Sequence, residues 1–157
     1  MVSGLRESLM QQCMILLVED NPDDEALALR ALKKANPKTQ VVVARDGQQA
    51  LDFVFGEGDY QGRNVAEQPV VIFLDMKLPK LNGLDVLRNI RNDQRTCLLP
   101  VVILTSSDES SDIKEAYRLG ANSYINKPVN FTEFSRQMNL MGEYWLDINR
   151  PPLCKLQ

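Results

Sequence analysis

Charged and hydroxyl side chains follow four separate apolar runs of this 157-residue sequence, and together they could form one reactive site. Glu19 and Asp20 follow the first run, Asp75 follows the third, Thr105 ends the fourth, and Lys127 comes shortly after the fifth. Carboxylates brought close together repel one another unless a hard divalent cation lies between them, and their oxygens are ligands that Mg²⁺ accepts. The lysine and the hydroxyl would then bind an anion. The set therefore predicts a phosphoryl-accepting site, with Asp75, the central carboxylate, as nucleophile.

Each of these motifs has a simpler explanation when it is taken alone. The acidic stretch "EDNPDD" at residues 19–24 is common at helix N-termini, where carboxylates face the positive end of the helix dipole. A hydroxyl such as that of Thr105 is often a helix cap, and a Lys-Pro pair is often a solvated turn. Asp75 is harder to explain in this way, because an acid that closes the apolar run "VVIFL" is partly desolvated and needs a cation or a hydrogen-bond donor. The joint spacing of the motifs favours a site.

Five short apolar runs have the composition of strands that are buried on both faces. They are mostly β-branched and do not alternate between apolar and polar residues, which is typical of a parallel sheet covered by helices on both sides. The expected strands are residues 14–18, 41–44, 70–74, 101–105 and 123–125. In such a sheet, ligands bind beyond the carboxyl ends of the strands, which is where the charged and hydroxyl side chains lie.

Amphipathic stretches after these runs predict five helices. In the first, residues 21–35, Asn21 can cap the N-terminus and Pro22 fits the first turn. Asn130 and Glu133 have capping-box spacing at the start of the last helix. The other helices are expected at residues 47–55, 83–93 and 110–120, and the last at 130–147. Repeated strand–helix units predict an α/β fold, a doubly wound five-stranded parallel sheet with helices on both faces.

The composition excludes several other kinds of function. Lys and Arg number 18 against 21 Asp and Glu, a net charge of −3, so there is no basic field for nucleic acid or an anionic membrane. The sequence has no histidine, which excludes Ser-His-Asp and Cys-His catalytic systems. No apolar run has the length of a membrane span or a signal peptide. Three scattered cysteines without CxxC spacing predict a reducing, cytoplasmic compartment.

Four linked motifs, "LLVEDN", "FLDMKLPKLNG", "ILTSS" and "YINKP", resemble the receiver domain of bacterial two-component response regulators, of which CheY is a familiar single-domain member. The resemblance covers roughly residues 14–146, so we expect residues 1–157 to be one receiver domain with short extensions and no output domain. It implies a flavodoxin-like strand order and transfer of a phosphoryl group from the histidine of a partner kinase to Asp75. Signalling would use phosphorylation-dependent protein contacts, and the protein would catalyse only its own phosphorylation and dephosphorylation.

The resemblance also implies a Mg²⁺ site at the predicted carboxylate cluster. The ligands would be Asp20, Asp75 and the backbone carbonyl of Lys77, and Glu19 would act through water. Lys77 stands two residues after the acceptor, at a position that varies in the family. The lifetime of the phosphorylated state is therefore left open.

On the other flank of Asp75, the resemblance assigns roles to a hydroxyl, a lysine and an aromatic residue. Thr105 would hydrogen-bond the phosphoryl group, Lys127 would pair with it, and the bond between Lys127 and Pro128 would be cis. The family couples the hydroxyl of the fourth strand to an aromatic residue three positions before the lysine, here Tyr124. Taken alone, Tyr124 could be an ordinary half-buried strand tyrosine. With Thr105 and Lys127 in place, we favour a switch made by Thr105 and Tyr124.

A finer resemblance is to the small response regulators of cyanobacterial phytochromes. It rests on "EDNPDD", the extended loop at residues 56–69 and the tail "EYWLDINRPP", and it implies a phytochrome-type, light-regulated kinase as donor and a homodimer. The last helix and the tail hold more apolar residues than one stripe against a sheet would hide, so we expect some of them to be exposed and to pair, unless Tyr144 and Trp145 fold back on the domain. These residues are Phe134, Met138, Leu140, Met141, Tyr144, Trp145, Leu146 and Ile148.

Alternative functions fit the sequence less well. A haloacid-dehalogenase-type phosphatase needs a second aspartate two residues after the first, where this chain has Lys77. A flavodoxin-type FMN binder needs a phosphate-cradling loop after its first strand, where the carboxylates of "EDNPDD" would repel phosphate. The intact set of Asp75, Thr105 and Lys127 argues against a receiver that regulates by binding alone. No helix-turn-helix segment or basic patch follows residue 150, which argues against DNA binding.

Overall fold

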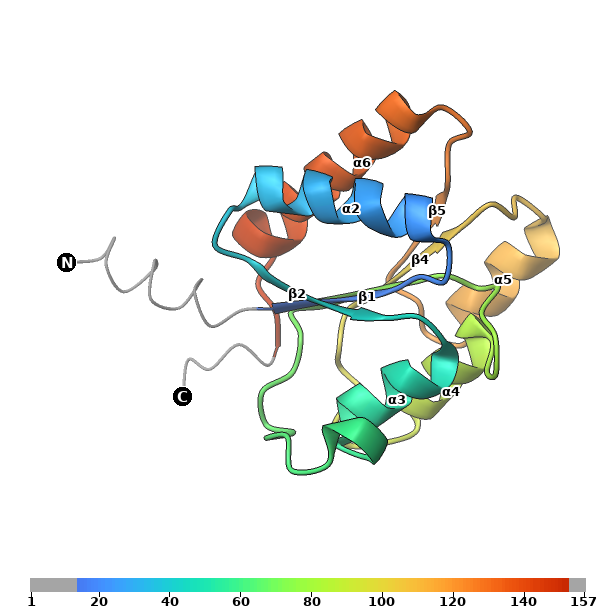
Figure 1. Ribbon diagram of the computed structural model, residues 1–157. Coiled ribbons are helices and arrows are strands. Elements are labelled where there is room, and N and C mark those ends of the chain that lie inside the picture. Colours follow the sequence, from blue (N-terminus) through green and yellow to red (C-terminus); the bar gives the residue numbers. More distant parts are fainter. Residues whose placement is uncertain (1–13, 153–157) are drawn as a thin grey trace.

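Five parallel strands form one sheet in the computed structural model, which describes residues 14–152 (Figure 1). The strands lie in the order β2-β1-β3-β4-β5, so the predicted flavodoxin-like order is confirmed. Every strand lies within one residue of its predicted bounds, since the apolar runs are short and end abruptly at polar residues. The bounds are β1 Met14–Val18, β2 Gln40–Ala44, β3 Val71–Leu74, β4 Val101–Thr105 and β5 Ser123–Asn126.

Five α-helices cover the two faces of the sheet, as predicted. Helices α2 and α6 lie on one face, and α3, α4 and α5 lie on the other (Figure 1). Successive strand side chains point to opposite faces, so Phe73 packs in the α2 and α6 core while Ile72 and Leu74 pack in the other. The bounds are α2 Pro22–Ala35, α3 Gly47–Phe55, α4 Gly83–Arg91, α5 Ser110–Arg118 and α6 Phe131–Glu143.

The helix starts follow the predicted caps more closely than the helix ends do. Asn21 Oδ1 accepts from the backbone N–H of Asp23 at 2.9 Å, and Asn130 Oδ1 accepts from the backbone N–H of Glu133 at 3.0 Å. Helices α4 and α5 end at Arg91 and Arg118, two residues before the predicted ends at 93 and 120. A side-chain cap marks a start sharply, whereas an amphipathic pattern continues through the final turn and does not mark its end.

The C-terminal helix packs one apolar stripe against the sheet and leaves other apolar side chains exposed. Helix α6 stops at Glu143 and continues as a π-helix, η2, at Tyr144–Ile148, where one α-helix to residue 147 was predicted. Trp145 folds back against the α2 and α6 core, and the Tyr144 ring meets it edge-on, with centroids 5.0 Å apart. Phe134 and Met138 are buried, Met141 and Leu146 are partly buried, and Leu140, Tyr144 and Ile148 are exposed. The expected exposed apolar surface is therefore present.

The long loop at residues 56–69 is fastened to helix α3 and contains a short 3₁₀ turn, η1, at Gly58–Tyr60. The Arg63 guanidinium lies over the Phe53 ring, 4.0 Å from its centroid, and Arg63 Nε donates to the Phe53 carbonyl at 2.6 Å.

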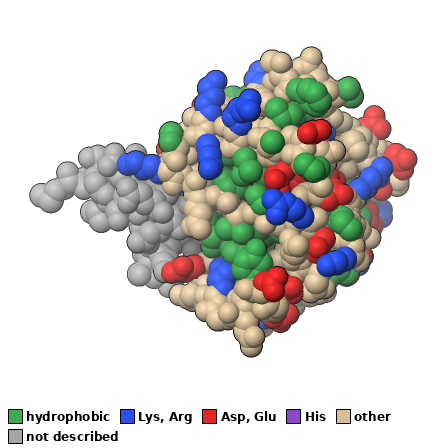
Figure 2. All heavy atoms as spheres, in the orientation of Figure 1, with side chains coloured by type: hydrophobic (Ala, Val, Ile, Leu, Met, Phe, Trp, Pro, Cys, Tyr) green, Lys and Arg blue, Asp and Glu red, His purple; other side chains and the backbone are tan. Residues whose placement is uncertain are grey.

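Figure 2 shows hydrophobic side chains gathered in the middle of one face, with charged side chains of both signs around them. Among residues 14–152, no helix combines the length and the apolar character needed to cross a membrane.

Candidate functional site

The carboxyl ends of β1 and β3 bring three predicted carboxylates together. The two strands are neighbours in register, with Val18 opposite Leu74, so Glu19 and Asp20 follow β1 beside Asp75, which follows β3. One carboxylate oxygen from each of these acids lies within 4.8 Å of the others. Glu19 and Asp75 are buried and Asp20 is exposed. This arrangement could hold a divalent cation, because closely spaced carboxylate oxygens are the ligands that Mg²⁺ takes.

Lys127, which follows β5, lies among these carboxylates and binds them directly. Its Nζ donates to Glu19 Oε2 at 2.5 Å, to Asp75 Oδ2 at 2.8 Å and to Asp24 Oδ2 at 3.1 Å. The lysine side chain is only 10% exposed. Its backbone N–H donates to the Thr105 carbonyl at 2.7 Å, which continues the β4–β5 pairing and directs the side chain across the sheet edge. The lysine neutralises part of the charge of the cluster.

Burial and ion pairing shift the pKa values of Glu19 and Lys127. Burial raises the pKa of Glu19 to about 7, although the hydrogen bond from Lys127 opposes this shift. Burial acts to lower the pKa of Lys127, but its hydrogen bonds to Asp75 and Glu19 outweigh burial and raise that pKa above its ordinary value. The lysine therefore stays protonated at neutral pH. The raised pKa of Glu19 therefore reflects mainly the removal of its carboxylate from water, with a smaller contribution from the neighbouring Asp75.

The turn after Asp75 has a shape that only a glycine allows. A Cβ on Gly83 would lie 2.1 Å from the Asp75 carbonyl oxygen, and the Gly83 N–H donates to the Met76 carbonyl at 2.8 Å. Asn82 caps α4 by accepting from the backbone N–H of Asp85 at 2.9 Å. The motif from Asp75 to Gly83 therefore packs the start of α4 directly against the strand end. Within this turn, Asp75 Oδ1 accepts from the backbone N–H of Lys77 at 3.1 Å.

A hydrogen-bonded group follows β4, on the other side of Asp75. Thr105 is fully buried, and its Oγ1 accepts from the backbone N–H of Ser107 at 3.3 Å. The hydroxyl of Tyr124 donates to the Ser107 carbonyl at 2.8 Å, and Ser107 Oγ donates to Asp112 Oδ2 at 2.5 Å. Tyr124 is half-buried, and burial raises its pKa. Thr105 and Tyr124 are thus linked through one residue, Ser107.

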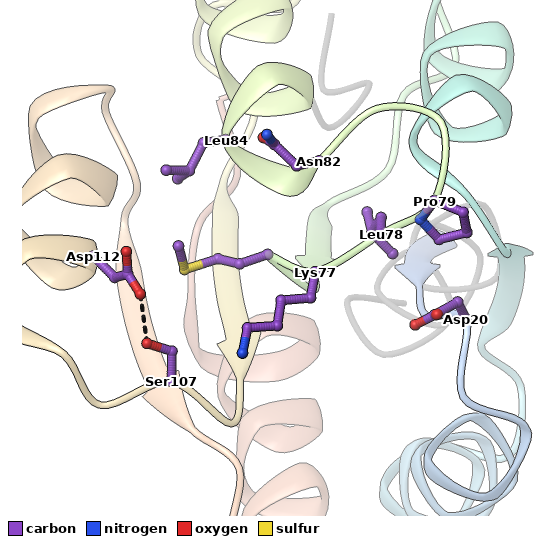
Figure 3. A pocket seen from close by; sticks show the side chains of 9 residues that line it. Asp20, Lys77, Leu78, Pro79, Asn82, Leu84, Ser107 and Asp112 are labelled. Atoms are coloured by element: carbon purple, nitrogen blue, oxygen red, sulfur yellow. Dashed lines mark hydrogen bonds between the residues drawn. The ribbon is translucent and has the colours of Figure 1, made fainter.

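A pocket of about 580 Å³ opens beside the carboxylate cluster (Figure 3). The Lys77 side chain extends between Asp20 on one side and the Ser107–Asp112 pair on the other (Figure 3). The turn from β3 to α4 supplies the rest of the wall, through Met76, Leu78, Pro79, Asn82 and Leu84. The pocket meets the carboxylate cluster at Asp20 and at Met76, the residue after Asp75.

The prediction of a cis bond between Lys127 and Pro128 is wrong. No cis peptide bond occurs within residues 14–152, so the bond between Lys127 and Pro128 is trans. The trans form of a bond before proline is intrinsically favoured by about 0.5–1 kcal/mol. Here the trans form already allows the Lys127 N–H to reach Thr105 and the Lys127 ammonium to reach the carboxylates, so no contact of the lysine requires the cis form.

Three residues that the fold brings to the site, Asp24, Ser107 and Asp112, were not predicted from the sequence. Asp24 was assigned only to the dipole of the first helix, yet its carboxylate also binds Lys127. The Ser107–Asp112 pair was not predicted at all. The signal for Asp24 was present, because Asn21 and Pro22 fix the start of α2 and so the direction in which its first turn faces. No sequence signal identified Asp112, since its partner is known only once the loop is folded.

A family model and two known proteins match most of this sequence. Residues 15–139 match the family model described as the response regulator receiver domain. The sequence is 39% identical over 140 residues to the probable methanogenesis regulatory protein FilR2 of Methanothrix harundinacea, covering 88% of this chain and 87% of that protein. It is 32% identical over 134 residues to the response regulator Rcp1 of Synechocystis, covering 85% of this chain and 89% of Rcp1.

Solved structures give the same result. The phosphorylated cyanobacterial phytochrome response regulator RcpA superposes with a TM-score of 0.83 at 35% identity, covering 89% of this chain and 98% of that one. The Mn²⁺-bound form of Rcp1 also superposes with a TM-score of 0.83, at 31% identity, covering 89% and 99%. Both structures therefore share the fold of this chain over most of its length.

Proposed function

Since the chain belongs to the response regulator receiver family, we propose that Asp75 accepts a phosphoryl group from the phosphohistidine of a sensor kinase. The observation that best supports this is the setting of Asp75, which is buried at the carboxyl end of a central strand and bound to Lys127 at 2.8 Å. A pocket that could admit a small anionic group opens at the same sheet edge, lined by Asp20 and by Met76, the residue after Asp75. A nucleophile held between a cation and an open pocket is arranged for group transfer.

The proposed reaction moves one phosphoryl group between two nucleophiles. An Asp75 carboxylate oxygen forms a bond to phosphorus while the bond from phosphorus to the kinase imidazole nitrogen breaks. The electron pair of that bond returns to the imidazole, and the product on this chain is an acyl phosphate. Lys127 and the Thr105 hydroxyl stabilise the charge on the transferred oxygens, since this transfer depends mainly on positioning and charge neutralisation.

We also propose that Mg²⁺ binds at Glu19, Asp20, Asp75 and the backbone carbonyl of Lys77, with Glu19 acting through water. Receiver domains bind Mg²⁺ at an acidic site, and the spacing of carboxylate oxygens within 4.8 Å in this chain fits that chemistry. When bound, the cation supplies positive charge between the carboxylates and the phosphoryl oxygens. Lys127, which now binds three carboxylates, is then free to pair with the phosphoryl group.

The proposed output is a shift between two conformations of the loop after β4. Thr105 moves toward the phosphoryl group on Asp75, and Tyr124 responds because both residues hydrogen-bond to Ser107. This loop lies at the surface, so its rearrangement changes the contacts that the domain offers to other proteins.

A phytochrome-type kinase is the proposed donor, and a homodimer is the proposed assembly. The similarity to RcpA and Rcp1 supports the donor. The exposed Leu140, Tyr144 and Ile148 near the C-terminus support pairing, and a two-fold arrangement is the commonest symmetry. Sedimentation of the chain with and without residues 144–157 tests the homodimer, and a monomer in both phosphorylation states would contradict it.

The central test uses Asp75→Asn, incubated with a phosphorylated sensor kinase and Mg²⁺. We expect complete loss of label on this chain, because an amide oxygen is too weak a nucleophile to form the acyl phosphate. Asp108→Asn, which changes an exposed carboxylate in the loop after β4, should be labelled like the parent protein. A parent protein that never takes up label would favour regulation by binding alone.

A further inference from the structure

The side chains of Ser107 and Asp112 form a short hydrogen bond that joins the loop after β4 to the first turn of α5. Ser107 Oγ donates to Asp112 Oδ2 at 2.5 Å, and Ser107 is 8% exposed while Asp112 is half-buried. A hydrogen bond to an ionised acceptor is among the stronger ones in proteins. The pair therefore restrains the loop at a position where both neighbours, Ser106 and Asp108, are exposed.

Ser107 is the point at which the two proposed switch residues meet. Its backbone N–H donates to Thr105 Oγ1 at 3.3 Å, and its carbonyl accepts from the Tyr124 hydroxyl at 2.8 Å. Because the Thr105 oxygen accepts from Ser107, the hydroxyl hydrogen of Thr105 stays available for another acceptor. Asp112 holds the side chain of Ser107, and so it indirectly holds the orientation of the Thr105 hydroxyl.

The same pair forms one wall of the pocket that meets the carboxylate cluster at Asp20 and at Met76, the residue after Asp75. Ser107 and Asp112 face the Lys77 side chain across this pocket, opposite Asp20 (Figure 3). A loop released from Asp112 would widen the pocket on that side. Water would then have easier access to a phosphoryl group on Asp75, and the Thr105 hydroxyl would be less well oriented toward it.

A purely local role for Asp112 at the start of α5 is the alternative. Asp112 lies in the first helical turn, where a carboxylate faces the positive end of the dipole. The N-cap residue Glu109 makes no side-chain cap hydrogen bond, and its backbone N–H donates instead to Ser107 Oγ at 3.4 Å. In that case removal of the carboxylate would lower stability without changing the chemistry at Asp75.

We propose that Asp112 is a positioning residue for the phosphoryl site, which acts through Ser107 to orient Thr105, to close one wall of the pocket and so to prolong the life of the acyl phosphate. This inference rests on the proposed phosphorylation of Asp75. Asp112 itself does not contact Asp75 or Lys127 through any hydrogen bond or ion pair described among residues 14–152.

The test compares Asp112→Ala, Ser107→Ala and the double variant with the parent protein. Each is phosphorylated with acetyl phosphate and Mg²⁺, and decay of the acyl phosphate is followed on phosphate-affinity gels well below the melting temperature. Loss of one oriented hydrogen bond should shorten the lifetime by a factor of about 2–10. The double variant should decay no faster than either single variant, because both changes remove the same bond.

Two further variants separate positioning from helix stability. Asp112→Asn keeps an oxygen that accepts from Ser107 but loses the charge, so its lifetime should lie between those of Asp112→Ala and the parent. Asp108→Ala removes an exposed carboxylate from the same loop and should have no effect. Asp112→Ala with an unchanged lifetime, or single effects that add in the double variant, would overturn this inference alone. A parent protein that takes up no phosphoryl group would overturn the proposed function as well.

Discussion

Two partly buried cations, Lys127 and Arg91, are used in opposite ways in this domain. Lys127 lies at the carboxyl edge of the sheet, with Glu19, Asp24 and Asp75 as its partners. Arg91, at the end of α4, binds only uncharged oxygens among residues 14–152. Nε donates to the Gly120 carbonyl at 2.9 Å, Nη1 donates to the Leu99 and Cys97 carbonyls at 2.7 and 3.1 Å, and Nη2 donates to Asn122 Oδ1 at 2.8 Å.

The pKa values of these two cations shift in opposite directions. Burial lowers the pKa of Arg91, because its carbonyl partners carry no net charge. Hydrogen bonds to Asp75 and Glu19 outweigh burial at Lys127 and raise its pKa. An arginine among carbonyls fixes the chain segments around it, whereas a lysine among carboxylates balances charge that a metal ion could balance instead. One cation is structural, and the other belongs to a site that can change its state.

The largest effect should come from Lys127→Ala. We expect the rate of phosphotransfer to Asp75 to fall by about 10²–10³, since a cation that stabilises the transferred oxygens is lost. Without Mg²⁺ the variant should also melt at a lower temperature, because the carboxylates repel one another. Added Mg²⁺ should raise the melting temperature of the variant more than that of the parent. An equal rise in both proteins would show that Lys127 and the metal ion do not share this role.

Arg91→Ala should show the opposite pattern. Loss of its hydrogen bonds leaves several backbone carbonyls without their partner, and we expect the free energy of unfolding to fall by about 2–4 kcal/mol. Arg91→Lys should recover only part of this, because an ammonium cannot reproduce the planar fork that spans these acceptors. Urea unfolding measures the loss. Phosphotransfer at a temperature where the variant is folded should stay near the parent rate, and a large drop would place Arg91 in the site.

The smallest of these effects is expected for Asp20→Ala. Asp20 is exposed, so water screens its charge, and loss of one carboxylate should weaken Mg²⁺ binding by about 1–2 kcal/mol, roughly tenfold. The fold should be unaffected without metal, since one of several like charges is removed. Calorimetric titration with Mg²⁺ checks this expectation, with Asp108→Ala as a control for overall charge. Unchanged Mg²⁺ affinity would mean that the cation binds elsewhere.

The contrast between the two cations also shows which charged residues can be identified from the sequence alone. Lys127 was identified because it follows a short strand and complements Asp75 across the same sheet edge. Arg91 was not identified, because one of many charged residues in amphipathic helices gives no sign that it turns inward. Its partners lie 6 to 31 residues further along the chain, so only the fold reveals them. Asp112 escaped notice for a similar reason.

Local chemistry was sufficient for the strands, the helix starts and the set of residues at the carboxyl edge. Apolar runs, caps such as Asn21 and the spacing of Asp75, Thr105 and Lys127 act over a few residues or through a repeated strand–helix order. Tertiary structure alone decided the π-helix that follows α6 and the partners of Lys127 and Arg91. These features depend on distances between segments far apart in the chain, where packing and desolvation, and not local preference, determine which contact has the lower free energy.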